Sequence, residues 1–215
     1  MSDRWFQLRV MGIVALVLPP FAIILVMLIH GLPIPMSISE TATMTDASDF
    51  LLPLCLGAYS LLSLTYALHY SYDDILDKII TACMCGGFFL VAVQKCASPY
   101  VTGTHIGLFR LTPEWSHIIH CIGAVVGFGA MILWIMLCFS KSNKSKAKQT
   151  KQKRLRNNIY YGLGWAMVAS LGIFAFDLLG LLGSGFPTTF IAEWIMLTFG
   201  GTACLIKGGT FLKDK

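Results

Sequence analysis

The chain has 215 residues, of which 56% are apolar and 13% are charged, and its mean hydropathy is +0.71. This composition excludes an ordinary soluble domain, a disordered chain and a collagen-like repeat. The net charge is +5, but eight of the sixteen basic residues lie in one short segment, from Lys141 to Arg156, so the charge does not indicate a nucleic-acid-binding surface. Long apolar runs separated by short charged segments predict an integral membrane protein instead.

Six apolar runs follow one another along the sequence, and each is long enough to cross a bilayer of ~30 Å at about 1.5 Å per residue. They cover residues 10–30, 50–69, 75–94, 117–140, 159–182 and 189–206. The predicted fold class is all-α: a polytopic membrane protein with six transmembrane helices in one domain, residues 1–215. Arg4 and Arg9 precede the first run, but no small-x-small cleavage site follows it, so we expect a true span there rather than a signal peptide.

Short motifs refine the first half of this pattern. Pro19 and Pro20 lie in the middle of the first run and predict a kink, because each removes a backbone hydrogen-bond donor. Asp74 precedes the third run and is expected to open that helix. It is also expected to pair with Lys78, one helical turn further on.

The fourth run carries two further signals. Thr112, Pro113 and Glu114 form a typical helix start, with a hydroxyl at the N-cap, a proline in the first turn and an acid near the positive end of the helix dipole. Gly123 and Gly127 are four residues apart, which favours close packing against a neighbouring helix.

The distribution of basic residues predicts the orientation. With the N-terminus inside, fourteen of the sixteen Lys and Arg residues are cytoplasmic, and only Lys95 and Arg110 are outside. An even number of spans then places the C-terminus in the cytoplasm as well. The basic segment 141–156 becomes a cytoplasmic loop, either a solvated one or one that contacts anionic lipid at about 1 kcal/mol per basic residue. The expected location is the cell membrane, with membrane lipids as partners.

In this orientation, polar residues that are distant in the sequence share one depth, in the outer third of the bundle. Ionised acids at the bilayer centre cost about 2.5–3.5 kcal/mol and usually face the bundle interior, so such residues mark a candidate site. We expect them to line an outward-facing polar cavity that binds a lipid or small ligand. The candidate ligand-binding residues are Glu40, Arg110, His117, His120, Asp177 and Glu193.

Several alternatives remain for these residues. His117 and His120 share a helix face, so they can bond to loop carbonyls, contact a ligand headgroup, or hold a metal ion together with a carboxylate. Asp177 and Glu193 either lock helices together, through a partner such as Arg110 or a histidine, or serve the function directly. No metal site is assigned.

The sequence contains no Walker loop, Gly-x-Ser-x-Gly, His-Glu-x-x-His or Cys-x-x-Cys motif. The preferred function is therefore non-enzymatic binding of a lipid or small ligand, without a cofactor. One alternative is a metal-dependent intramembrane hydrolase, for which the metal would be zinc. A second alternative is a small-solute transporter, indicated only by the paired acids within the spans.

Some motifs resemble those of known families. Ile38-Ser39-Glu40, Gly107-Leu108-Phe109-Arg110 followed by His117 and His120, and Glu193-Trp194 resemble the damage-regulated autophagy modulator superfamily and its uncharacterised bacterial six-helix relatives. This resemblance implies a membrane protein involved in lipid handling or membrane organisation. The chain is also similar to ceramidase and adiponectin-receptor-like hydrolases as a compact helical bundle with His, Asp and Ser near one membrane face. Those enzymes use seven or more spans and three zinc-binding histidines, a set that this sequence lacks.

Overall fold

The computed structural model describes residues 3–31, 37–44, 46–70, 74–101, 103–141, 149–181 and 187–212. These residues form helices and connecting loops, with one isolated β-bridge between Ile106 and Leu111, which confirms the predicted all-α class. In chain order, the helices are α1 (Asp3–His30), α2 (Ile38–Met44), α3 (Asp46–His69), α4 (Ile75–Val93), α5 (Pro113–Leu133), the π-helix η1 (Trp134–Phe139), α6 (Lys151–Leu178) and α7 (Thr188–Lys207).

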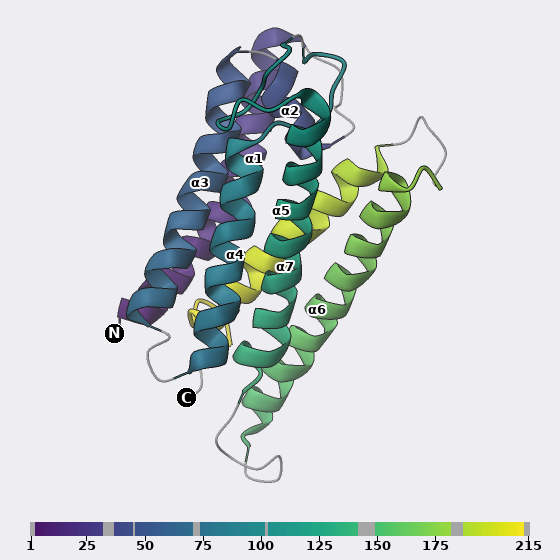
Figure 1. The fold of residues 1–215 in the computed structure, drawn as a ribbon. Helices are drawn as coiled ribbons and strands as arrows, with labels where there is room; N and C mark the ends of the chain where they lie inside the picture. Colours follow the sequence, from purple (N-terminus) through teal and green to yellow (C-terminus); the bar gives the residue numbers. More distant parts are fainter. Residues whose placement is uncertain are drawn as a thin grey trace.

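Among the described residues, five helices are long and apolar enough to cross a membrane, which makes this a membrane protein. They are Asp3–Ile29, Ile75–Val93, Pro113–Phe139, Lys151–Leu178 and Thr188–Lys207. The predicted second span corresponds to α3, which is not among the five. It nevertheless packs along α1 and α4 (Figure 1).

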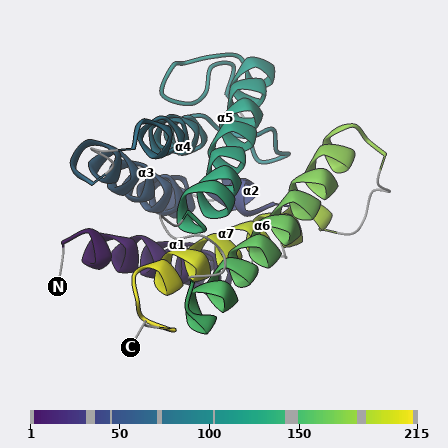
Figure 2. The ribbon, with the colours of Figure 1, turned by 90° about the horizontal axis from the view of Figure 1, so that it is seen from below.

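The long helices form two layers, with α3, α4 and α5 in one and α1, α7 and α6 in the other (Figure 2). Within the second layer, α7 packs against both α1 and α6. The start of α1 and the end of α7 lie at the same end of the bundle, which we call the terminal end (Figure 1). The short helix α2 and the loop 94–112 lie at the opposite end, which we call the α2 end.

The helix bounds differ from the predicted ones where local signals are weak. α1 begins at Asp3 and is one continuous helix through Pro19 and Pro20. The short α2 falls inside a segment that the sequence treats only as a connection, because seven residues are too few to show a helical period. α6 begins at Lys151, so the last part of the predicted basic loop is helical, and residues 142–148 lie outside the described part of the chain.

The two predicted helix starts behave differently. Thr112 is the N-cap residue of α5, but its side chain makes no capping bond, and its hydroxyl lies 3.4 Å from a Glu114 carboxylate oxygen. Asp74 does cap α4 by accepting a hydrogen bond from the Asp77 amide. Its ion-pair partner is Lys141 and not the predicted Lys78, and the hydrogen bond from the Lys141 ammonium lowers the pKa of Asp74.

The predicted close packing of the glycine pair in α5 is confirmed. A Cβ atom placed on Gly87 of α4 would lie 2.3 Å from the Gly127 nitrogen and 2.8 Å from the Gly123 carbonyl oxygen. The backbones of α4 and α5 therefore touch, and no side chain fits between them. A Cβ atom placed on the preceding residue, Gly86, would have no such neighbouring atom within 4 Å.

This contrast gives a matched pair of substitutions. Gly87→Ala is expected to lower the stability by about 1–3 kcal/mol, because the added methyl group forces the two backbones apart. Gly86→Ala is expected to raise it by up to about 1 kcal/mol through helix propensity. The apparent melting temperature of the two variants in one detergent measures the difference. Equal shifts would show that α4 and α5 tolerate separation.

Candidate functional site

A cavity with a volume of about 760 Å³ lies at the α2 end of the described part of the chain. This is within the range of about 300–1,000 Å³ that is typical of small-molecule sites. Its walls come from α2, α3, the last residues of α4, the loop 94–112 and one residue of α5. The wall formed by the long helices is mainly apolar, with Pro53, Leu56, Val91, Ala92 and Val93. The wall formed by the loop is mixed: Lys95, His105 and Arg110 lie among apolar residues such as Val101, Ile106 and Leu108.

The two predicted histidines hold the loop onto α5. His120 is buried, and its Nδ1 lies 2.7 Å from the Gln94 carbonyl oxygen. His117 Nδ1 accepts a hydrogen bond of 3.0 Å from the Ala97 amide. The buried Ser116 hydroxyl completes the attachment by accepting from the Lys95 amide at 3.1 Å. Both histidines therefore make hydrogen bonds to the loop backbone, which is one of the three alternatives given above. His120 also lines the cavity.

Arg110 lies on a tight turn at the edge of the cavity. The turn is closed by the bridge between Ile106 and Leu111, and Arg110 has φ +48°, a left-handed conformation that side chains other than glycine rarely adopt. Gly107 precedes it with φ +70°, and a Cβ atom there would lie 2.3 Å from the Gln94 Oε1. The turn therefore needs glycine at position 107, and it holds the exposed Arg110 side chain at the cavity.

The two buried acids Glu40 and Glu193 anchor α2. Glu193 of α7 accepts hydrogen bonds from the backbone amide of Ile38 and from the Ser39 hydroxyl, the latter at 3.3 Å. Glu40 lies in α2 and its carboxylate is 3.5 Å from the hydroxyl of Ser98 in the loop. These contacts connect α7, α2 and the loop 94–112, so both acids position the cavity wall. Glu193 itself borders a second space of only about 20 Å³.

Asp177 lies apart from these residues. It is at the end of α6, partly exposed, and accepts a hydrogen bond from the Thr189 hydroxyl of α7. Both views show this end of α6 away from α2 and the loop 94–112 (Figures 1 and 2). The six predicted ligand-binding residues therefore divide: Arg110 and His120 line the large cavity, His117, Glu40 and Glu193 hold its walls, and Asp177 joins α6 to α7.

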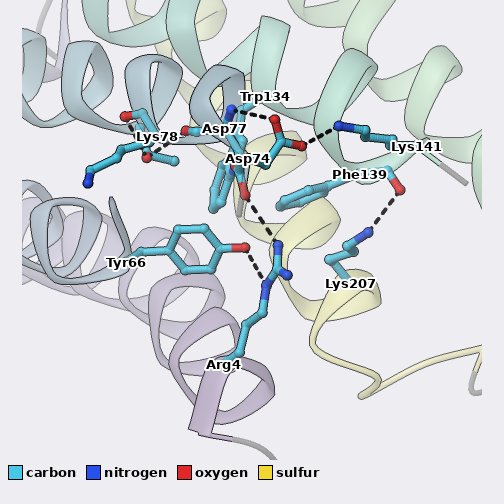
Figure 3. Close-up of polar contacts among 10 residues, drawn as sticks. Arg4, Tyr66, Asp74, Asp77, Lys78, Trp134, Phe139, Lys141 and Lys207 are labelled. Atoms are coloured by element: carbon cyan, nitrogen blue, oxygen red, sulfur yellow. Dashed lines mark hydrogen bonds and ion pairs between the residues drawn. The ribbon is translucent and has the colours of Figure 1, made fainter. Parts of the chain in front are cut away.

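Sequence reasoning missed a second polar cluster, at the terminal end (Figure 3). Asp77 of α4 is 2% exposed and accepts hydrogen bonds from the Trp134 indole nitrogen and, at 3.2 Å, from Arg4. Arg4 also donates to the Tyr66 hydroxyl at 2.8 Å. The cluster therefore joins α1, α3, α4 and η1. An acid in the first turn of one apolar run and an arginine before another, both on the predicted cytoplasmic side, are signals that could have revealed it.

Other basic side chains at the terminal end bond to carbonyl groups at helix ends (Figure 3). Lys207 of α7 donates to the carbonyl oxygen of Phe139 at 3.0 Å, and Lys153 of α6 donates to the same oxygen at 3.3 Å. Arg9 donates to the Gly208 carbonyl at 2.7 Å. These contacts satisfy the carbonyls that a helix leaves unpaired at its C-terminus.

Within the described residues, no group of three or more His, Cys, Asp or Glu side chains is arranged to hold a metal ion. Comparison of the chain with protein-family models, curated proteins and solved structures finds no match.

Proposed function

We propose that this protein binds a lipid or another small amphiphile in the cavity at the α2 end. The composition of the lining carries the proposal: α3 and α4 contribute an apolar wall, and the loop 94–112 adds the basic and polar side chains of Lys95, His105 and Arg110 among further apolar ones. An apolar chain against the first wall gains about 0.8 kcal/mol per buried CH₂ group, while a polar headgroup stays near the loop. The resemblance to the damage-regulated autophagy modulator superfamily, with its implied role in lipid handling, agrees with this function.

The proposal includes six spans with both termini in the cytoplasm of a cell. The start of α1 and the end of α7 lie at one end of the bundle, which agrees with an even number of passes (Figure 1). The sixth pass is then α3, which packs along α1 and α4. Placing the terminal end in the cytoplasm also puts fourteen of the sixteen basic residues there, including the basic segment 141–156 beside the anionic inner leaflet. The cavity then opens outward.

A cavity-filling substitution tests the function. Ala42 of α2 is partly buried and lines the cavity, whereas Ala169 of α6 is exposed on the outside of the bundle. The protein is reconstituted in nanodiscs of phosphatidylcholine and phosphatidylglycerol, transferred to detergent and passed through gel filtration. The phospholipid that stays bound is then counted by mass spectrometry. We expect the parent and Ala169→Trp to retain phospholipid and Ala42→Trp to lose it.

Retention of the same phospholipid by Ala42→Trp and the parent, with both proteins folded, would contradict the proposal. Metal analysis of the same samples distinguishes the hydrolase alternative. One zinc ion per chain that is lost in His117→Ala would favour a metal-dependent enzyme over a lipid-binding protein.

A further inference from the structure

Two basic residues depart from the charge distribution of this protein. In the proposed orientation fourteen of its sixteen Lys and Arg residues are cytoplasmic, in agreement with the positive-inside rule, and only Lys95 and Arg110 are assigned to the opposite side. The positive-inside rule does not account for these two positions. Both of them line the 760 Å³ cavity.

Among the described residues that line the cavity there is no aspartate or glutamate. Gln94 is 2% exposed and lines the same cavity, and its side-chain Nε2 has no hydrogen-bond partner within the described part of the chain. An unpaired buried donor is unfavourable, so a group that accepts hydrogen bonds is expected beside it. Lys95, Arg110 and the Gln94 side chain with its unpaired Nε2 donor therefore line the same cavity.

Arg110 has an unusual backbone conformation. Its φ of +48° is strained for a residue other than glycine, and the bridge between Ile106 and Leu111 maintains that conformation. Strained backbone in a non-glycine residue is concentrated at ligand-binding positions. Here it sets the direction in which the Arg110 side chain leaves the turn beside the cavity, and a guanidinium has a fork of donors that suits an oxyanion.

We infer that the cavity selects an amphiphile whose headgroup carries a net negative charge on phosphate or carboxylate oxygens, with Arg110 as the main contact. This inference rests on the proposed function, since it names the ligand class of the same cavity. The acyl chain lies against the apolar wall of α3 and α4, and the headgroup lies against the loop 94–112. Lys95 lies on the same wall.

The test compares two lipids with the same acyl chains. The protein is reconstituted in nanodiscs of equal parts phosphatidylglycerol, which is anionic, and phosphatidylcholine, which is zwitterionic, and the retained lipid is identified after gel filtration. We expect phosphatidylglycerol to be enriched roughly fivefold, which is typical of one partly exposed charged hydrogen bond. Arg110→Asn should abolish the enrichment without unfolding the loop, because asparagine tolerates positive φ and removes only the charge. Lys78→Asn removes an exposed charge at the terminal end and should keep the enrichment.

The outcomes separate this inference from the proposed function. If the parent and Arg110→Asn both retain the two lipids in equal amounts, the cavity does not select an anionic headgroup. The proposed lipid binding would still stand. Retention of no lipid by the parent overturns both. A third arm adds inorganic phosphate during gel filtration: loss of the phosphatidylglycerol enrichment at millimolar phosphate would show that the site binds a free oxyanion and not a lipid. Persistence of the enrichment supports the amphiphile.

Discussion

Asp77→Ala is expected to lower the free energy of unfolding by about 2–4 kcal/mol. The substitution leaves the indole N–H of the fully buried Trp134 without an acceptor and removes the ion-pair partner of Arg4. Because the Arg4 side chain is 43% exposed, water can replace part of its lost contact, so most of the effect comes from Trp134. The apparent melting temperature in detergent measures the loss.

Two asparagine variants separate charge from hydrogen bonding. Asp77→Asn keeps an acceptor for the Trp134 indole and should lose about half as much stability as Asp77→Ala. Asp74→Asn removes the same charge one turn earlier, and asparagine caps a helix as well as aspartate does, so its effect should be much smaller. If Asp77→Ala and Asp74→Asn melted at the same temperature, the cluster at the terminal end would not stabilise the bundle.

Glu193→Ala is expected to cost about 2–4 kcal/mol and to weaken lipid retention as well. The carboxylate is 6% exposed and accepts from the Ile38 amide and the Ser39 hydroxyl, so its removal leaves two buried donors unpaired. The start of α2 then loses its attachment to α7, and the cavity wall formed by Ala42 and its neighbours loosens. Hydrogen exchange of residues 38–44, compared with that of α4, reports the release of α2.

Asp177→Ala is the comparison for this substitution. Asp177 is partly exposed and bonds one hydroxyl, that of Thr189, so its loss should cost less than about 1 kcal/mol and leave lipid retention unchanged. A Glu193→Ala protein that melts with the parent yet loses its lipid would mark Glu193 as a ligand contact and not as an anchor. Equal losses in the two variants would show that the burial of Glu193 has no energetic consequence.

Asp177 and Glu193 show which part of the site could be predicted from the sequence and which part could not. Asp177 and Glu193 occupy equivalent places in the sequence, each about one turn inside the predicted outer end of an apolar run, so the sequence assigns them one role. The structure separates them because α6 contacts chiefly α7, while the start of α7 also meets α2. Which neighbour a helix face meets depends on the packing of the whole bundle, and no local pattern encodes it.

The sequence by itself determined the membrane character, the all-α class and the close packing of Gly123 and Gly127, because hydropathy and residue size act locally along the chain. Only the tertiary structure decided which polar residues meet. It formed the Asp77 cluster from four segments and placed the short α2 over a cavity. It also brought Lys95 and Arg110 to one space. Such contacts join residues that are far apart in the chain, and they form only when the buried faces of the long helices have packed together.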